Sequence, residues 1–163
     1  MVLWREVSVD DPAAHQLLVE YFESRARDFP PSQGVYRTTF PQAANFVLPR
    51  GVFLVVEADG ESGQPADVGC GGIRLIEPNT SGGIRFEVKH LWLRPQVRGR
   101  GYGRALLVEL ERRARALGAA ELVLDTNASL EAAGSLYRSA GFRSVPAYND
   151  NPNATDWYAK TLD

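Results

Sequence analysis

The sequence predicts a single α/β domain, residues 1–163, built on a β-sheet with both antiparallel and parallel strands. Three observations predict it. First, the 163 residues are 44% hydrophobic and 23% charged, which is enough for one hydrophobic core and too little for two comfortable ones. Second, residues 51–93 contain three strand-like runs separated by polar turns, which is typical of an antiparallel meander. Third, helical and strand-like runs alternate after residue 101, which indicates a parallel crossover.

The first fifty residues combine a strand, a helix and a proline-rich connection. Residues 3–9 alternate enough to form a strand. Two acidic residues followed by Pro12 are typical of a helix start, and apolar residues at helical spacing extend that helix to about Arg25. Residues 28–49 contain four prolines and one short helical stretch near 42–47. This segment is expected either to line a binding cleft or to serve as a plain surface connection.

The middle of the chain supplies the meander. Residues 52–56 form a continuous β-branched and aromatic run, which indicates a strand buried on both faces. Polar, glycine-containing turns at 59–65 and 79–83 separate this run from two further strands at 68–76 and 84–93. Strands joined by such short turns are expected to pair antiparallel.

The last third of the chain changes its pattern. Apolar residues recur at helical spacing within residues 101–117, which predicts an amphipathic helix. A short buried strand is expected at 121–126 and a second helix at 130–140. Two more strands are expected at 142–145 and 157–162.

The composition excludes several classes of protein. A formal net charge of −2 argues against a protein that binds nucleic acid by bulk electrostatics. The single cysteine, Cys70, cannot form an internal disulfide, and without a metal-binding spacing no metal is expected. No apolar run approaches the roughly 20 residues of a membrane span, and residues 1–6 lack the order of a signal peptide. We therefore expect a cytoplasmic protein with neither nucleic acid nor membrane as a partner.

Residues 96–104, Gln-Val-Arg-Gly-Arg-Gly-Tyr-Gly-Arg, carry the sharpest chemical signal. Three glycines at alternate positions let the backbone turn tightly and expose N–H groups to a ligand, and the helix that follows directs its positive end to the same place. Three arginines add charge, and no acidic residue occurs from 88 to 108. The pattern predicts a site for a diphosphate group, the alternative being a turn that only caps an ordinary helix. The loop lacks the lysine of a P-loop and the third glycine of a dinucleotide-binding fingerprint.

These residues resemble a known family. Residues 87–107 are similar to the strand, pyrophosphate loop and helix of the GNAT superfamily of acyl-CoA-dependent N-acetyltransferases, including its Arg/Gln-x-x-Gly-x-Gly core. Residues 125–127 and 136–142 resemble the later asparagine of that family and its Leu-Tyr-x-x-x-Gly-Phe signature. The stretches 148–151 and 157–160 resemble one bacterial subgroup.

The resemblance, which is specific over about residues 68–145, implies an α/β fold with a mixed, centrally splayed sheet flanked by helices. It implies acetyl-CoA as the cosubstrate and an amine as the acceptor, and it allows a homodimer. The favoured function is direct transfer of the acetyl group to a primary amine of a small molecule or amino acid. A protein N-terminal or lysine acetyltransferase and a non-catalytic CoA-binding sensor are the alternatives.

The resemblance also implies which residues bind the cosubstrate. The strand backbone at Leu91, Trp92 and Leu93 would hold the pantetheine arm. Asn127 would bond the pantetheine or thioester end or, alternatively, shape the turn before the next helix. The diphosphate would lie on the loop formed by Arg98, Gly99, Arg100, Gly101, Tyr102, Gly103 and Arg104.

Two catalytic residues are implied as well. Tyr137 would meet the departing sulfur, with a purely core position as the alternative; because a tyrosine pKa of about 10 exceeds the value of about 8.5 for a thiol, its first contribution would be a hydrogen bond. Glu87 would act as the base through water, the alternative being a solvated charge at the strand end. His90 is a rival base. Strand alternation puts it on the face opposite Glu87 unless a bulge intervenes, and a core or edge histidine is the simpler interpretation.

The remaining candidates concern the acceptor. A pocket for it is expected to be framed by residues before the meander and after the parallel half, namely Tyr36, Arg37, Tyr148, Asn149, Trp157 and Tyr158. Arg37 is expected either to clamp a substrate carboxylate or to lie on the surface. Cys70 is interpreted as a small buried residue rather than an acyl-carrying nucleophile, and His15 is expected to face solvent.

Overall fold

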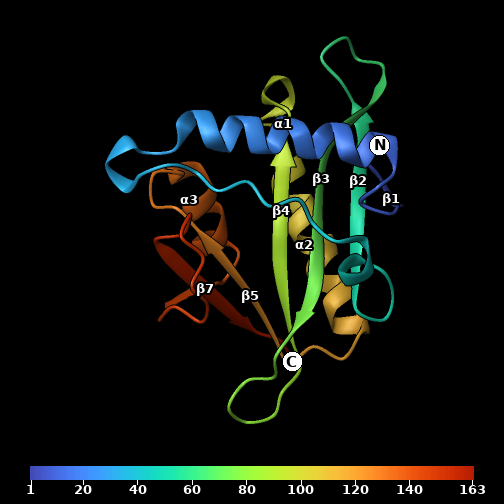
Figure 1. Cartoon of the computed structure of the whole chain (residues 1–163). Coiled ribbons are helices and arrows are strands. Elements are labelled where there is room, and N and C mark those ends of the chain that lie inside the picture. The colour runs from blue at the N-terminus through green and yellow to red at the C-terminus, as the bar shows by residue number, and fades with distance from the viewer.

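A seven-stranded mixed sheet forms the centre of the computed structural model, which describes residues 1–163 (Figure 1). In chain order the strands are β1 (Leu3–Glu6), β2 (Gly51–Asp59), β3 (Pro65–Ile76), β4 (Arg85–Leu93), β5 (Glu121–Thr126), β6 (Arg143–Val145) and β7 (Asp156–Thr161). The spatial order is β1-β2-β3-β4-β5-β7-β6, and every neighbouring pair is antiparallel except β4 and β5. Both the predicted meander and the predicted parallel crossover are therefore confirmed.

Helices cover both faces of this sheet (Figure 1). The α-helices are α1 (Pro12–Asp28), α2 (Tyr102–Ala116) and α3 (Glu131–Ser139), and short 3-10 turns occur at η1 (Pro31–Gln33), η2 (Ala43–Phe46) and η3 (Pro95–Val97). The helix α1 begins as predicted, because the Asp11 carboxylate accepts the N–H of Ala13 at 2.9 Å. It continues beyond the predicted end at Arg25 to Asp28. None of the three helices combines the length and the apolar character that a membrane crossing requires.

Two hydrophobic clusters lie on opposite faces of the sheet. The larger holds buried side chains of α2 and α3, such as Leu106 and Tyr137, against inner positions of the strands. The smaller holds α1 residues such as Leu17 and Phe22 against Phe53 and its neighbours. All five side chains predicted as buried on both faces of β2 have at most 2% of their surface exposed, which confirms that prediction.

The parallel strands β4 and β5 separate soon after they begin. They pair only where Arg85, Phe86 and Glu87 lie opposite residues 121–123. Beyond Glu87 the strands diverge, and Figure 1 shows β5 leaning away from β4 toward α3. The splayed sheet that the resemblance implied is therefore present, and residues 88–93 have no strand partner on that side.

A β-bulge interrupts β4 at this point of divergence. His90 has a φ of 59°, and the register with β3 shifts between Cys70 and Gly72. Phe86 and Val88 face the α2 cluster, so Glu87 faces α1; the His90 ring also packs on the α1 side, 5.5 Å from Phe22. Plain alternation, which placed His90 opposite Glu87, is thus overridden by the bulge.

Two further differences from the predicted elements involve the outer strands. The strand β1 ends at Glu6 instead of Val9. The strand β7 lies between β5 and β6, so the two strands that flank α3 are not neighbours. Strand order of this kind depends on pairing between distant segments, which local periodicity does not report.

Candidate active site

The glycine-rich loop between β4 and α2 presents a run of free backbone amides. Gly99 and Gly101 have φ values of 82° and 85°, and Gly101 caps α2 without a side chain. None of the six N–H groups from Gly99 to Arg104 donates a hydrogen bond within the chain, whereas the N–H of Arg98 donates to the Pro95 carbonyl at 3.3 Å. Six free amides at the positive end of a helix have the geometry that suits an anion, whereas the N–H of Arg98 is already bonded.

The arginines of this loop brace it against neighbouring elements. Arg98 donates from Nε to the Leu93 carbonyl at 3.0 Å, and its guanidinium lies 4.7 Å from the centre of the Trp92 ring. Arg100 donates to two carbonyls of the β2–β3 turn at 3.2 Å each, and Arg104 donates to the hydroxyl of Ser139 on α3. The guanidinium groups therefore hold the loop in shape, while the backbone amides remain free for a ligand.

The open edge of β4 leads from this loop into the molecule. The N–H of Arg94 donates to the Val68 carbonyl at 2.8 Å, so the alternation of an antiparallel pair directs the backbone of Trp92 toward β3 and that of Leu91 and Leu93 toward the open side. Leu91 and Leu93 thus fit their predicted role as partners of a peptide-like arm. Trp92 does not, because its backbone pairs with β3 and its side chain is buried against α1.

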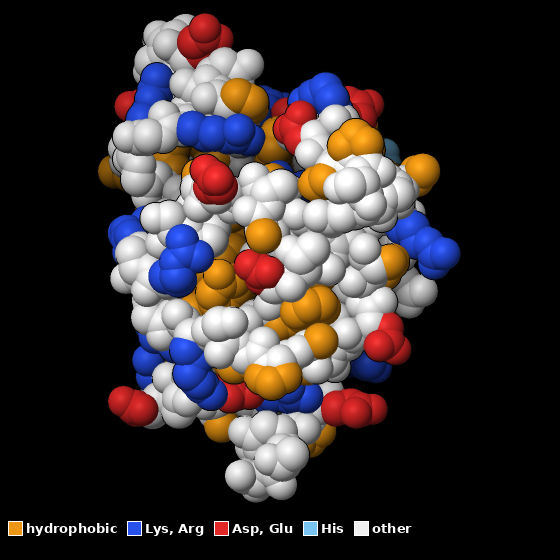
Figure 2. Space-filling model, turned by 90° about the vertical axis from the view of Figure 1, so that its left-hand side faces the viewer, with side chains coloured by type: hydrophobic (Ala, Val, Ile, Leu, Met, Phe, Trp, Pro, Cys, Tyr) orange, Lys and Arg blue, Asp and Glu red, His pale blue; other side chains and the backbone are white.

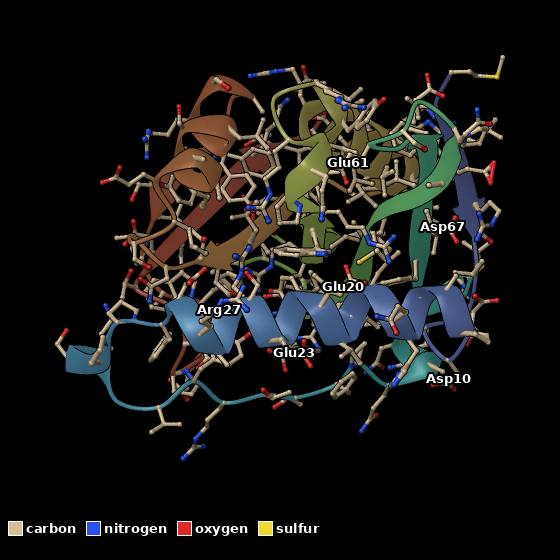
Figure 3. All side chains as sticks on the ribbon, turned by 90° about the horizontal axis from the view of Figure 1, so that it is seen from above. Asp10, Glu20, Glu23, Arg27, Glu61 and Asp67 are labelled. Carbon is tan, nitrogen blue, oxygen red and sulfur yellow. The ribbon has the colours of Figure 1, made fainter.

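A cleft of about 530 Å³ opens where β4 and β5 diverge. Its walls come from the second half of α1, the connection after it, β3, the bulge of β4, the end of β5, α3 and the loop before β7. Seen from above in Figure 3, the chain after α1 turns back and runs alongside the helix on the side away from the sheet. Residues 28–49 therefore line a cleft, which was one of the two expectations for that segment.

Tyr137 lies in the wall of this cleft with a free hydroxyl. Only 7% of the residue is exposed, its ring packs 6.2 Å from Phe142 and 6.1 Å from Tyr158, and its hydroxyl makes no hydrogen bond within the chain. Burial raises the pKa of Tyr137 to about 12. The hydroxyl is therefore a protonated donor at neutral pH. The ring of Tyr137 lies in the core while its hydroxyl lies free in the cleft wall, so the two positions are compatible.

Glu87, the predicted base, is enclosed by partners. Its side chain is 1% exposed, Arg74 donates to one carboxylate oxygen at 2.9 Å, and the hydroxyl of Tyr148 donates to the other at 2.6 Å. Arg74 and Asn149 line the cleft, whereas Glu87 does not. The side chains of Arg74 and Asn149 therefore lie between this carboxylate and the cleft. Glu87 is not the solvated charge at the strand end that the alternative interpretation expected.

His90 lines the cleft inside a ring of aromatic side chains. Tyr21 and Phe22 each lie 5.5 Å from the imidazole and Phe46 lies 5.9 Å from it, and Nδ1 has no hydrogen-bond partner. Burial, reinforced by the charges of Lys89 and Arg74, lowers the pKa of His90 to about 3. The ring is neutral at physiological pH and too weakly basic to take a proton from an ammonium group.

Asn127 is committed to the protein itself. Its amide donates to Gln33 at 2.7 Å and to the carbonyl of Asn153 at 3.1 Å, and its oxygen accepts the N–H of Ser129 at 3.0 Å. These bonds shape the turn after β5 and join η1 to the loop before β7. Although Asn127 lines the cleft, both of its donor hydrogens are occupied.

The other sequence candidates divide between the cleft and its surroundings. Tyr36, Arg37 and Asn149 line the cleft, whereas Tyr148, Trp157 and Tyr158 do not. Cys70 is buried with its Sγ 3.5 Å from the His90 carbonyl, and burial raises the pKa of the thiol. His15 is exposed and stacks 5.5 Å from Phe40. These findings confirm the expected burial of Cys70 and the expected exposure of His15.

Sequence reasoning missed a polar network at the floor of the cleft. Asp125 accepts hydrogen bonds from Asn149 at 2.8 Å and Asn151 at 3.1 Å, and Lys89 lies 3.5 Å from the same carboxylate. A third residue of this series, Asn153, bonds the backbone of Arg37. The asparagines at alternate positions 149, 151 and 153 were the available signal.

Comparison with known proteins gives two partial relatives. An "IAA acetyltransferase" from Azospirillum brasilense is 41% identical over 90 residues, which cover 55% of this chain and 53% of that protein. An uncharacterized N-acetyltransferase from Schizosaccharomyces pombe is 39% identical over 66 residues, 40% of each chain. The match therefore spans about half of the first relative and two fifths of the second.

Solved structures and a family model cover much more of the chain. An acetyltransferase of the GNAT family from Staphylococcus aureus matches with a TM-score of 0.73 over 100% of both chains at 15% identity. A GNAT family acetyltransferase from Elizabethkingia anophelis, solved with acetyl-CoA bound, matches with a TM-score of 0.64 at 16% identity over 99% of this chain and 98% of that one. The model of the Acetyltransferase (GNAT) family matches residues 12–142. With most of its length matched in this way, the chain belongs to the Acetyltransferase (GNAT) family.

Proposed function

We propose that this protein transfers the acetyl group of acetyl-CoA directly to a primary amine of a small molecule or amino acid. Membership of the family supports acetyl-CoA as the acetyl donor. The observation that carries the proposal is the run of six free amides from Gly99 to Arg104, which continues along the open edge of β4 to the cleft that holds the Tyr137 hydroxyl.

The residues present fit acetyl-CoA by their donor chemistry. The free amides of the loop would hold the diphosphate, and the backbone of Leu91 together with the N–H of Leu93 would bond the amide groups of the pantetheine arm, since the Leu93 carbonyl already accepts from Arg98. When bound, acetyl-CoA supplies a thioester whose carbonyl carbon is open to attack by an amine. Tyr137 then donates a hydrogen bond to the sulfur, because its raised pKa keeps the hydroxyl protonated.

The acceptor must lose a proton before it can attack. Four cationic side chains but only two acidic ones line the cleft, and they are Arg25, Arg37, Arg74, Lys89, Asp28 and Asp125. A positive surrounding lowers the pKa of a bound ammonium group, so the neutral amine is favoured. We propose that the proton leaves to water and that Glu87 positions Arg74 and Tyr148 instead of touching the acceptor.

The segment after α1, residues 28–49, forms the roof of the cleft, and the way it is held supports a small acceptor. This segment runs alongside α1 (Figure 3). The side chain of Asn153 fixes Arg37 in it by bonding both the N–H of Arg37 at 2.9 Å and its carbonyl at 2.8 Å. A roof fastened in this way favours an amino acid or small amine over the lysine of a folded protein. On the face shown in Figure 2 basic and acidic side chains are intermingled, so this face offers no continuous basic surface for a nucleic acid.

A panel assay tests this proposal. Thiol release from acetyl-CoA is measured against small amines, amino acids and short peptides, beside calorimetry with CoA. We expect release with small acceptors. Release with peptides alone would support a protein acetyltransferase, and CoA binding without release on any amine would support a sensor module.

A further inference from the structure

We infer that the acceptor carries a carboxylate on an aromatic body and that Arg25 and Arg37 bind this carboxylate. The inference rests on the proposed function and narrows its substrate class. Its starting point is the pairing of charges in the cleft, where two of the four cations have a carboxylate partner and two have none.

The paired cations are those on the strands. Arg74 bonds Glu87 at 2.9 Å, and Lys89 lies 3.5 Å from Asp125. Neither Arg25 nor Arg37 has an ion-pair partner. The remaining acid of the cleft, Asp28, pairs at 3.8 Å with Arg27, which lies outside the lining, and the neutral His90 adds no charge. A cleft with two uncompensated guanidinium groups attracts an anion and repels an acceptor whose only charge is an ammonium group.

Arg25 lies near the place of acetyl transfer. It is half-buried on α1, with its guanidinium 5.0 Å from the centre of the Tyr21 ring and 6.0 Å from that of Trp92. Arg25 and Tyr137 line the same cleft, so the guanidinium and the tyrosine hydroxyl face one ligand space. A carboxylate on Arg25 therefore leaves an amine only a few bonds away within reach of the thioester.

Arg37 supplies the second cation from the segment that follows α1. Its backbone is held at both polar groups by Asn153, while its guanidinium makes no hydrogen bond within the chain. The fork of an arginine matches both oxygens of a carboxylate, which gives orientation as well as attraction. The backbone of Arg37 is thus fixed in place, and its guanidinium is free to bind a ligand.

Besides Tyr137, six aromatic phenylalanine and tyrosine side chains line the cleft. They are Tyr21, Phe22, Phe29, Tyr36, Phe40 and Phe46. Neighbouring rings pack closely, with centroids 4.8 Å apart for Phe22 and Phe40 and 5.6 Å apart for Phe29 and Tyr36. The same 530 Å³ must also receive the acetyl end of the cosubstrate, so the space left suits a body of single-amino-acid size. An aromatic amino acid meets all three conditions of charge, surface and size.

Two matched acceptors test the inference in the full-length protein. L-phenylalanine and phenethylamine share the ring and the amine, and only the first has a carboxylate. We expect the wild type to show a kcat/KM at least tenfold higher for phenylalanine. Arg25→Gln and Arg37→Gln should each reduce the ratio of kcat/KM for phenylalanine to that for phenethylamine at least tenfold and leave the KM for acetyl-CoA unchanged. Arg27→Gln is the control, because Arg27 lies two residues after Arg25 on α1 (Figure 3) and outside the cleft lining. This variant should keep the preference for phenylalanine over phenethylamine.

Three outcomes would overturn the inference. Equal turnover of the two acceptors by the wild type would do so, as would a preference that survives in both arginine variants. If Arg25→Gln raised the KM of acetyl-CoA and not that of phenylalanine, the guanidinium would serve a phosphate of the cosubstrate instead, and the assignment of Arg25 would fall.

A binding measurement separates this inference from the proposed function. 3-Phenylpropionate has the ring and the carboxylate but no amine, and calorimetry should detect its binding to the wild type and its loss in the double variant Arg25→Gln/Arg37→Gln. Absence of binding would overturn the carboxylate site even if amines were acetylated. Binding without acetylation of any amine would support the carboxylate site while the proposed function failed.

Discussion

At the residue scale, the free hydroxyl of Tyr137 is the group whose chemistry is most directly exposed to test. Removal of this hydroxyl in Tyr137→Phe should lower kcat about 100-fold or more, the usual range for a lost general acid, and leave the Kd of CoA unchanged. Thiol release and calorimetry measure the two quantities. Tyr158→Phe is the control, because Tyr158 is also buried but its hydroxyl accepts from Arg138 outside the cleft lining.

The pH dependence gives a second readout of the same prediction. The hydroxyl acts while protonated, and burial raises its pKa to about 12, so kcat of the wild type should not fall between pH 7 and pH 10. A fall in this range that disappears in Tyr137→Phe would contradict the assignment, as would an unchanged kcat in that variant.

Glu87 was expected to act as a base through water, and the structure encloses its carboxylate between Arg74 and Tyr148. Glu87→Gln should lower the free energy of unfolding by about 2 kcal/mol, because Arg74 and Tyr148 lose a charged acceptor. It should lower kcat/KM less than about tenfold, against the 10²–10⁴ of a lost base, with an unchanged pH profile. Denaturant titration and steady-state kinetics measure these effects.

A buried carboxylate far from the cleft provides the comparison for Glu87. Glu109 on α2 is bonded by Arg112 and Arg113, so Glu109→Gln should also destabilise the protein but leave kcat/KM unchanged. Loss of the ascending limb of the pH profile in Glu87→Gln alone would return Glu87 to the role of base.

At the scale of elements, the loop and the helix α2 form the anion site together. Gly101→Ala adds a Cβ that meets no atom within 4 Å, so the cost comes from the positive φ of 85° and is about 1 kcal/mol. We expect the loop to relax that strain by moving its amides, with a loss of CoA affinity of tenfold or more in calorimetry.

The turn between β3 and β4 supplies a matched control for that substitution. Gly82 has a φ of 81° and equally open surroundings, so Gly82→Ala carries the same backbone cost away from the loop. Equal CoA affinity in the two variants would show that the shape of the loop does not matter for binding.

The elements show which features local sequence determines. The strand 121–126 and the helix of residues 102–116 were predicted within one or two residues, because each has its own periodicity and its own terminal signal. The bulge at His90 was not predictable, since a histidine at a φ of 59° breaks the preference of its residue type and is held there by β3. That bulge moves His90 into the cleft.

At the scale of the whole molecule, the cleft exists because distant segments are tied together over the splayed sheet. Asn153→Ala removes both bonds to the backbone of Arg37 and should expose this segment. We expect tryptic cleavage after Arg37 to accelerate about tenfold, the effect of about 1.4 kcal/mol of lost hydrogen bonding, with the Kd of CoA unchanged.

The turn between β3 and β4 contains a comparable asparagine. Asn79 accepts the N–H groups of Ser81 and Gly83, so Asn79→Ala loosens a turn away from the cleft and should not change cleavage at Arg37. If Asn153→Ala left the rate of cleavage after Arg37 unchanged, contacts other than those of Asn153 would hold residues 28–49 over the cleft, and the prediction would be contradicted.

The cosubstrate half of the site was more predictable than the acceptor half. The loop 98–104 is continuous in sequence, so its glycines and arginines predict an anion site without knowledge of the fold. The acceptor half joins Arg25, Arg74 and Asp125 from three separate elements, and only the pairing of distant strands brings them together. The hydrogen-bond partners of Asn127 were likewise not predictable, because its amide donates to Gln33, 94 residues away in the chain.

The most direct measurement follows the backbone amides of residues 99–104 by ¹H–¹⁵N NMR during titration with CoA and, separately, with pantetheine. Our account predicts large shifts of these six amide signals with CoA and none with pantetheine, which lacks the diphosphate. Binding of CoA that leaves these six signals in place would contradict it.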